Sequence, residues 1–215
     1  MAILRFSLIL TLCFAFISNF SAVSYAAKIP KGAVHEKDFT YKGIALSDPE
    51  EKVLKKLGKP VYTREKSVYG VAVRYLEYKN DVAVGILMRN NTVAEIIIDD
   101  KKYKARRGVR YGATTHYIEE TYGKQKKELI NGVTQYMYER PGHKYEYLVL
   151  ELDSETNSLK RMKITRLPMT EEAADLMGED PLISNDLFVI LAGTQEIDTS
   201  ALKKPKPVKI RGMEK

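Results

Sequence analysis

Two stretches of this 215-residue chain, GIALSDPEEKVLKKLGK (residues 43–59) and GVRYGATTHYIEETYGK (residues 108–124), share one pattern of glycines and apolar residues. Each begins with a glycine and carries a second glycine fifteen positions later. Val53 of the first stretch corresponds to Ile118 of the second at an offset of 65 residues. Glycines and apolar positions that recur in one register predict an internal repeat.

The first stretch predicts a short helix. Asp48 is expected to cap it, with Pro49 at the first helical position and Glu51 at the spacing of a capping box. Acidic residues lead this segment and lysines close it, which complements the helix dipole. Gly58 is expected to end the helix in a left-handed conformation.

The second stretch predicts a helix of the same kind. Thr114 or Thr115 is expected to cap it, and Gly123 to end it. Ile118 and Tyr122 are four residues apart, so they are expected to form one buried stripe, as Val53 and Leu57 do in the first copy.

Segments with the alternation typical of strands follow each helix. The expected strands are 71–78, 82–89 and 92–99 in the first copy and 126–130, 133–140, 144–153 and 158–167 in the second. Asn131-Gly132 joins two of these strands and is a strong hairpin signal. The expected fold class is therefore α+β, with two tandem repeats (residues 43–107 and 108–167), each a short helical segment followed by a three- or four-stranded antiparallel sheet. Units of this size bury little surface alone, so the copies are expected to pack into one body.

The start of the chain predicts export. Residues 1–27 begin with the positive charge of Arg5, continue through an apolar run over 8–17 and end in small residues, as a secretory signal does. The alternative is a membrane helix that stays attached, but polar residues interrupt the run early. We expect a periplasmic or extracellular protein with no integral membrane segment after signal removal.

The cysteine content narrows the class of protein further. The single cysteine, Cys13, excludes a disulfide framework and a cysteine-based zinc cage, because both need several sulfur atoms. It lies inside the apolar run, which disfavours lipid attachment. The net charge of +7 includes only Arg5 from the predicted signal, so the exported chain would stay basic.

The remaining segments flank the two copies. Residues 28–42 are expected to form an extended lead-in, and residues 168–202 a C-terminal helical segment in which Thr170 caps a short helix that Gly178 ends. The tail 203–215 is basic and interrupted by proline, which predicts disorder.

Motifs for catalysis and cofactor binding are missing from the sequence. There is no nucleophile elbow, phosphate-binding glycine loop or Cys–His arrangement, so we expect no enzyme activity and no cofactor. His116, Glu119 and Glu120 have helical spacing that suits a metal ion, but no pattern supplies the further ligands, and we expect no metal site. A nucleic-acid partner is not expected either, because no module interleaves basic residues with stacking aromatics.

Tyrosine is the unusual feature of the composition, with fourteen tyrosines and no tryptophan. The candidate partner-binding tyrosines, in or beside predicted strands, are Tyr75, Tyr78, Tyr136, Tyr138, Tyr145 and Tyr147, with Arg74, Arg140 and Lys144 as a basic rim. One interpretation is core and cross-strand packing. The other is a tyrosine-lined sheet face that binds a partner, since tyrosine joins a large contact area to a polar tip.

Two family resemblances follow from these motifs. The second copy carries Gly108-x-x-x-Gly112-x-Thr114-x-x-x-Ile118-x-x-x-Tyr122-Gly123, which resembles the helix motif of the β-lactamase-inhibitor-protein-like modules, including the small lipoprotein of the outer-membrane barrel assembly machine. The first copy, with Leu57-Gly58-Lys59-Pro60, Ser67-Val68-Tyr69-Gly70, Val84-Gly85-Ile86 and Val93, also resembles the N-terminal module that accompanies CAP domains. The resemblance spans roughly residues 43–167. It implies a helix-hairpin packed on an antiparallel sheet and used for protein contact rather than catalysis.

These features together predict an exported, non-enzymatic protein-binding or scaffold module of the cell envelope, whose partner is another envelope or extracellular protein. One alternative is a binder of anionic wall polymer or lipid surface, acting through basic residues such as those of the tail 203–215. Another is a hydrolase acting on envelope material, since Asp99, Asp100 and Glu151 are candidates for a general-acid pair.

Overall fold

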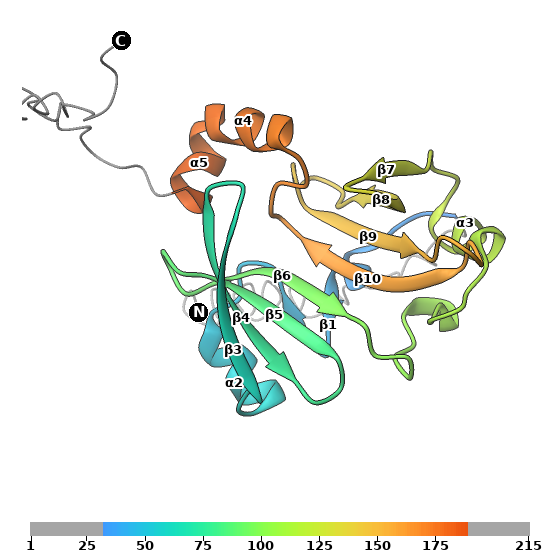
Figure 1. Ribbon diagram of the computed structural model, residues 1–215, viewed down its shortest axis with the longest axis horizontal. Coiled ribbons are helices and arrows are strands. Elements are labelled where there is room, and N and C mark those ends of the chain that lie inside the picture. The colour runs from blue at the N-terminus through green and yellow to red at the C-terminus, as the bar shows by residue number, and fades with distance from the viewer. Residues whose placement is uncertain (1–31, 189–215) are drawn as a thin grey trace, which may run out of the picture. The chain divides into compact units, whose positions relative to one another are not determined.

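An eight-stranded antiparallel sheet forms the centre of the computed structural model, which describes residues 32–188 (Figure 1). The order of strands across the sheet is β3-β4-β5-β6-β10-β9-β8-β7. Their bounds are β3 (Tyr62–Val68), β4 (Val71–Tyr78), β5 (Val82–Leu87), β6 (Val93–Ile98), β7 (Glu128–Ile130), β8 (Val133–Glu139), β9 (Tyr147–Leu152) and β10 (Leu159–Thr165).

Short helices and one small hairpin complete the described part of the chain. They are the 3₁₀ helix η1 (Glu36–Phe39), the hairpin of β1 (Thr40–Tyr41) and β2 (Ile44–Ala45), α2 (Glu50–Leu57), the 3₁₀ helix η2 (Arg106–Gly108), α3 (Thr115–Tyr122), α4 (Glu171–Glu179) and α5 (Pro181–Leu187). The α+β class and the antiparallel sheet are thus confirmed. None of the described helices has the length and apolar character needed to cross a membrane. The predicted signal 1–27 and tail 203–215 lie outside the described residues.

The sheet consists of two four-stranded halves that follow each other along the chain. Strands β3 to β6 follow α2, and β7 to β10 follow α3. The last strand of each half meets its counterpart in the middle of the sheet, where β6 and β10 pair antiparallel with Ile98 opposite Met162 and Ile96 opposite Ile164. This pairing makes one continuous sheet of the two halves.

Backbone hydrogen bonds correspond between the halves at an offset of 65 or 66 residues. The N–H of Val93 donates to the carbonyl of Asp48 at 2.8 Å, and the N–H of Leu159 donates to the carbonyl of Ala113 at 2.8 Å. Two further correspondences are the bridges Pro49–Thr92 and Thr114–Ser158, and the closing bonds from Gly58 to Leu54 and from Gly123 to Glu119. The helix of each half is therefore tied to the last strand of that half by equivalent contacts.

Both ends of α3 and the C-terminal end of α2 lie at the residues predicted from the sequence. Thr114 caps α3 by accepting a hydrogen bond from the N–H of Tyr117, and the helices end at Gly58 and Gly123 with φ of 80° and 103°. Val53 and Ile118 are fully buried.

The predicted cap of α2 is wrong. Pro49 occupies the N-cap position without a side-chain hydrogen bond, so the helix begins one residue later than expected. The carboxylate of Asp48 instead accepts the N–H of Ala45 at 2.7 Å and pairs with Lys52. Asp48 thereby holds the turn before the helix.

The flanking segments also differ from expectation. The described part of the lead-in is not simply extended, because it forms η1 and β1 and buries Phe39 and Tyr41. Gly178 does not end α4, which continues through it to Glu179. Asp180 then caps α5, an element the sequence did not predict.

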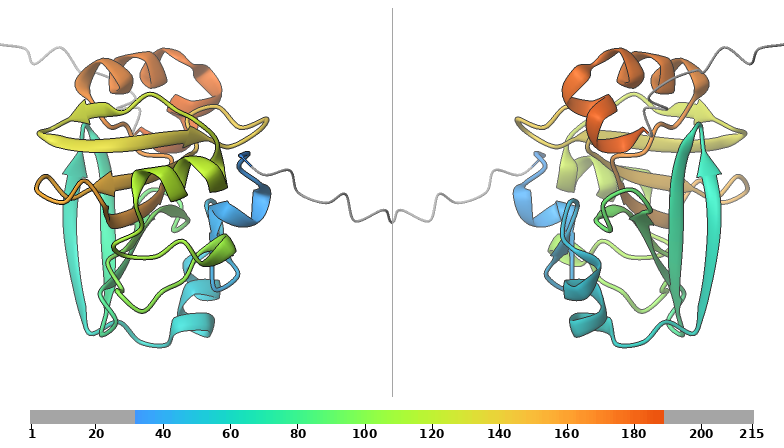
Figure 2. Two further views of the ribbon diagram at one scale, coloured as in Figure 1. Left: turned by 90° about the vertical axis from the view of Figure 1, so that its right-hand side faces the viewer. Right: turned by 90° about the vertical axis from the view of Figure 1, so that its left-hand side faces the viewer.

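The two faces of the sheet are covered differently. On one face, here called the covered face, η1, α2 and α3 pack over the larger apolar core, which includes Val53, Ile96, Ile118 and Ile164. On the other, the open face, a smaller apolar cluster lies under α4 and α5 at one end of the sheet, where Met177 and Leu187 are buried. In Figure 2, η1 and α2 lie at one side of the view and strands β3 and β4 of the sheet at the other. The rest of the open face is left without a helix.

Replacing Gly123 with alanine is expected to destabilise the protein more than replacing Gly58. Both glycines have a backbone conformation that is essentially restricted to glycine, which carries a strain of about 1–3 kcal/mol for any other residue. A Cβ at Gly123 would also lie 2.5 Å from the carbonyl oxygen of Gly32, whereas nothing lies within 4 Å of a Cβ at Gly58. Equilibrium denaturant unfolding of G123A and G58A measures the difference. Equal losses would contradict the close approach of residues 32 and 123.

Candidate functional site

The predicted tyrosines do not share one exposed face. Tyr136 and Tyr138 are 0% and 6% exposed and belong to the core under the covered face. Tyr75 is 3% exposed and lies on the open face. Of the two interpretations of the strand tyrosines, core packing therefore holds for these three, and they offer little surface to a partner.

Tyr136 and Tyr138 attach β8 to α3. The hydroxyl of Tyr136 donates to the Glu119 carboxylate at 2.6 Å, and the hydroxyl of Tyr138 donates to the carbonyl of Gly123 at 2.8 Å. Burial raises the pKa of both hydroxyls, so they stay protonated as donors. Their role is to hold the second helix against the sheet.

The remaining predicted tyrosines are half-buried and are divided between the two faces of the sheet. Tyr78 packs beside the core of the covered face, whereas Tyr145 packs beside the apolar cluster of the open face. Tyr147 lies opposite Thr165 of β10, which places it on the open face. The structure thus places Tyr145 and Tyr147 on the open face and Tyr78 on the covered face.

The predicted basic rim is also dispersed. Arg74 pairs with Glu50 of α2 at 2.6 Å, and Arg140 joins Glu36 of η1 to Glu146. Lys144 is exposed and lies 3.5 Å from Asp180. Arg74 and Arg140 thus fasten flanking elements to the sheet.

The open face carries a groove that consists of two hollows. Its first part, here called the upper hollow, has a volume of about 370 Å³. The residues that line it are Arg64, Lys66, Ser67, Val68, Tyr69, Tyr75, Glu95, Ile97, Asn131, Lys163, Leu167, Pro168 and Met169. A second part, the lower hollow, has a volume of about 290 Å³ and shares Arg64 and Ile97 with the first.

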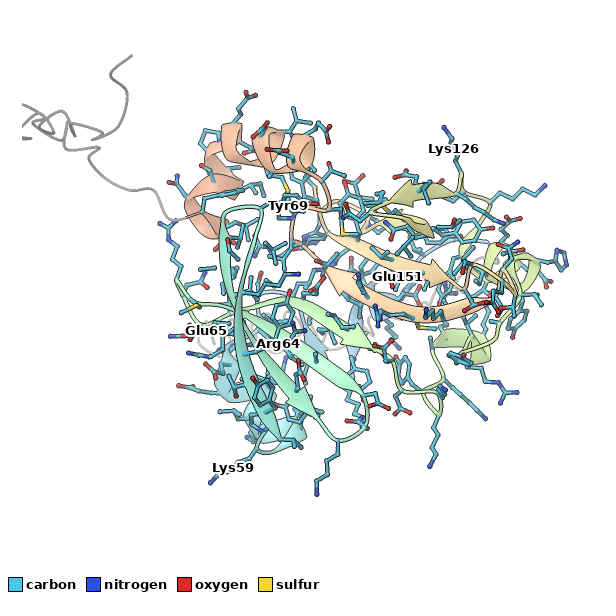
Figure 3. The ribbon with its side chains drawn as sticks, viewed as in Figure 1. Lys59, Arg64, Glu65, Tyr69, Lys126 and Glu151 are labelled. Carbon is cyan, nitrogen blue, oxygen red and sulfur yellow. The ribbon has the colours of Figure 1, made fainter. Side chains whose placement is uncertain are left out.

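The β3–β4 hairpin forms one wall of this groove. Its turn consists of Tyr69 and Gly70, both with positive φ, which is the conformation that tight antiparallel hairpins need. The amide of Asn131 donates to the hydroxyl of Tyr69 at 3.3 Å and to the carbonyl of Met169 at 3.2 Å. The turns of the β3–β4 and β7–β8 hairpins, which contain the two edge strands of the sheet, therefore meet. Figure 3 shows Tyr69 at the tip of its hairpin.

A glycine in β5 lets two polar side chains meet across a strand. In the sheet register, Tyr75 lies opposite Gly85, and Gly85 lies opposite Glu95. A Cβ at Gly85 would come within 3.1 Å of the Tyr75 ring and 3.4 Å of the Glu95 side chain. Because that Cβ is missing, the hydroxyl of Tyr75 reaches across β5 and donates to Glu95 at 2.7 Å.

Glu95 is the buried acid of the upper hollow. It is 7% exposed, and burial raises its pKa above the usual range for glutamate, against the opposing hydrogen bonds from Tyr75 and Thr165 and the charge of Lys163. Burial and the neighbouring Glu95 carboxylate likewise raise the pKa of Tyr75. The pair is thus biased towards holding its protons.

Oppositely charged side chains continue this polar row across β10 and β9. Glu151 accepts from Lys163 and, at 3.2 Å, from Arg161, and Arg161 also donates to Asp99 at 2.7 Å. Figure 3 shows Glu151 on these central strands. Both carboxylates, Asp99 and Glu151, are thus held by cations.

The other candidate chemistry does not converge either. Asp100 accepts the N–H of Lys102 at 2.8 Å within a turn. Within residues 32–188, no three histidine, cysteine, aspartate or glutamate side chains come together as a metal ion would require. His116 is exposed on α3.

Reasoning from the sequence missed most of the groove residues, among them Arg64, Glu95 and Lys163. A signal for Glu95 is present, because it is the single charged residue in the apolar strand Val93–Ile98. A charge in a buried strand needs a partner, which points to a polar cluster on one face. Arg64 and Lys163 come from strands whose mixed sequence gives no comparable signal.

Comparison with known proteins gives weak likenesses only. No protein-family model matches the chain, and no curated protein matches its sequence. An extracellular protein containing an SCP domain from Bacillus anthracis is 15% identical with a TM-score of 0.44, covering 64% of this chain and 49% of that one. A cysteine-rich secretory protein from Staphylococcus aureus is 9% identical with a TM-score of 0.39, covering 56% and 44%. The uncharacterized protein YfeY from Escherichia coli is 17% identical with a TM-score of 0.41, covering 60% and 93%.

The chain spans about half the length of the first two structures. These two are SCP (CAP) domain proteins. None of the three is described as a β-lactamase inhibitor protein or a barrel assembly lipoprotein, so that resemblance stays a prediction. Likenesses this weak assign neither a partner nor an activity.

Replacing Tyr136 with serine is expected to lower the free energy of unfolding by about 3–5 kcal/mol, because it empties a buried aromatic site. It also leaves the Glu119 carboxylate without its donor. Tyr62, which is 60% exposed on β3, is the matched control, and Y62S is expected to change stability by less than about 0.5 kcal/mol. Denaturant unfolding of Y136S and Y62S measures both. A loss in Y136S no larger than that in Y62S would contradict the burial of Tyr136.

The buried carboxyl of Glu95 predicts that stability falls as the pH rises. Since its folded-state pKa lies above the unfolded value of about 4.3, the folded state binds the proton more tightly, and unfolding becomes easier between the two pKa values. Replacing Glu95 with glutamine removes this titration. The unfolding free energy of E95Q relative to wild type should therefore rise as the pH increases above the unfolded-state pKa of about 4.3.

Urea unfolding at a series of pH values tests this expectation. E65Q, on the exposed strand β3, is the matched control and should follow the wild type. The effect would be ruled out if the difference in unfolding free energy between E95Q and wild type did not change with pH. It would also be ruled out if E95Q became less stable relative to wild type as the pH rises.

Proposed function

We propose that this protein is an exported, non-enzymatic binding module of the cell envelope, and that a partner protein docks in the groove of the open face. The observation that carries the proposal is the groove itself, with two hollows between the β3–β4 hairpin and strand β10 that share Arg64 and Ile97 in their linings. Concave sites of this size commonly combine apolar walls with a few placed polar groups.

The composition of the groove supports contact with another protein. The lining of the upper hollow includes the apolar residues Val68, Ile97 and Leu167 and the tyrosine Tyr69. Tyrosine and arginine are enriched where proteins bind each other, and Arg64 lies where the two hollows meet. Its guanidinium stacks 4.9 Å from the centre of the Tyr75 ring.

The distribution of charge supports a role in binding rather than in catalysis. Asp99 and Glu151 are both held by Arg161. The oxygens of Glu95 are engaged by hydroxyl groups of Tyr75 and Thr165. These contacts stabilise a fixed polar surface, whereas a general acid or base needs an open path to its substrate.

A tandem duplication accounts for the arrangement of the sheet. We propose that residues 43–107 and 108–167 are two copies of one α+β unit. The equivalent hydrogen bonds of Val93 and Leu159, and the equivalent glycine ends of α2 and α3, support this proposal. The groove then lies across the junction between the copies.

Export is proposed from the sequence of residues 1–27, which has the charged start, apolar run and small-residue exit of a secretory signal. Fractionation of the source cells with an antibody tests it. We expect the protein in the periplasm or the medium, shorter than the full chain by the signal, and retention in the cytoplasm would contradict the proposal.

Site-specific photocrosslinking tests the docking site. A photoreactive phenylalanine analogue is placed at Tyr69 or Met169 in the groove, and at Lys59 or Lys126 as matched surface controls (Figure 3). Illumination in the intact source cells should yield one adduct, containing the same partner, from both groove positions and none from the controls. An adduct that forms equally well from Lys59 or Lys126 would contradict docking in the groove.

A further inference from the structure

The groove has opposite free charges at its two ends. We infer that it binds an extended peptide segment that places an acidic side chain in the upper hollow and a basic side chain in the lower hollow. This inference rests on the proposed function, because it names the chemistry of the partner that the groove takes.

The upper hollow is rich in hydrogen-bond donors. Its cations are Arg64, Lys66 and Lys163, its neutral donors are Ser67, Tyr69 and Asn131, and its single acid is Glu95. Glu95 is buried, and its carboxyl group is hydrogen-bonded to the hydroxyl groups of Tyr75 and Thr165. It therefore opposes an incoming carboxylate only weakly. A carboxylate is the group that this set of donors suits best.

Lys66 is the free cation of the upper hollow. It is exposed on β3 and forms no hydrogen bond or ion pair within residues 32–188, whereas Lys163 is held by Glu151. Arg64 pairs with Glu77, but a guanidinium has five donors and can accept a further partner. Lys66 and Arg64 project from alternate positions of one strand, so both lie on the open face.

The lower hollow has the opposite balance. Its acids are Glu77, Asp81 and Asp99, and its cations are Arg64 and Arg161. Glu77 is paired with Arg64, and Asp99 is paired with Arg161. The side chain of Asp81 is exposed and has no ionic partner among the described residues, which leaves a free negative charge.

The separation of the two free charges sets the length of the occupant. In the sheet register, Lys66 lies opposite Val73 of β4, and Asp81 follows the end of β4 at Tyr78. Strands rise about 3.3 Å per residue, so the two levels lie roughly six residues apart along an extended peptide.

This polarity argues against a uniformly anionic polymer. A chain of phosphates that entered at Lys66 would meet Asp81 in the lower hollow, and like charges repel. The upper hollow also has an apolar wall, formed by Leu167, Pro168 and Met169, which suits the aliphatic side chains of a peptide. A peptide with both signs of charge fits both ends.

The test uses synthetic peptides with glutamate and lysine six residues apart in a serine–valine background. Controls of the same length carry two glutamines, two glutamates or two lysines, and tripolyphosphate stands for the polyanion. Binding to the purified protein is followed by ¹⁵N chemical shifts, which report both the affinity and the location. We expect the Glu/Lys peptide to bind most tightly, with shifts at residues 64–69 and 77–83, and more weakly at high salt.

Charge reversal at Lys66 and charge removal at Asp81 provide the matched variants. K66E should weaken binding of the Glu/Lys peptide by about fivefold, as the loss of one exposed ion pair allows. It should also improve binding of the peptide with two lysines. D81N should also weaken binding of the Glu/Lys peptide. K126E changes the same charge outside the groove and should leave every affinity unchanged (Figure 3).

The remaining outcomes overturn the inference. Equal binding of the glutamine control in the groove would show that the groove takes a peptide without reading its charge, which leaves the proposed function standing. Tighter binding of tripolyphosphate or the two-glutamate peptide would assign a polyanion instead. If no peptide changes the chemical shifts of the groove but the groove still forms crosslinks in cells, only the charge pattern is rejected. If those crosslinks are absent as well, the docking site is rejected too.

Discussion

The antiparallel pairing of β6 with β10 is the contact on which the rest of the structure depends. It sets Ile96 opposite Ile164 and Ile98 opposite Met162, so the two four-stranded halves become one sheet. Their helices then pack over a single core rather than two small ones. A unit of about 65 residues buries too small a fraction of its surface to be stable with ease, so the shared core matters to both halves. The same pairing brings Glu95 opposite Thr165 and Ile97 opposite Lys163, and it thereby builds the floor of the groove from both halves.

The long edge strand of the sheet carries charges that discourage self-association. Edge strand β3 carries Arg64, Glu65 and Lys66 in its middle, and charges on an edge strand discourage pairing with other strands. Antiparallel pairing of two copies centred on Glu65 would set Glu65 against Glu65 and Arg64 against Lys66. The same Arg64 and Lys66 line the groove, so two of the charges that protect the edge also contribute to the site.

The sequence predicted most of the strands because their apolar residues alternate or run together. It missed β3, since Tyr62–Val68 is exposed almost throughout and has no apolar period. The strand exists because β4 supplies a partner along its whole length. The cap of α2 was misplaced because Asp48 is used by the preceding turn, a tertiary choice that local propensity cannot show.

The site was harder to predict than the fold. Alternation shows that two tyrosines share a face, as Tyr136 and Tyr138 do, but it does not show which face the helices cover. The path from Tyr75 to Glu95 needs the missing side chain of Gly85 and a register between three strands. The free charges of Lys66 and Asp81 become visible only when the partners of their neighbours are known.

Hydrogen–deuterium exchange on the protein, alone and bound to the partner recovered by crosslinking, tests the central claim most directly. If the partner occupies the open face, protection should appear in segments 64–69, 77–83 and 167–169 and leave α2 and α3 unchanged. Protection confined to α2 and α3, with the groove segments exchanging as in the free protein, would contradict it.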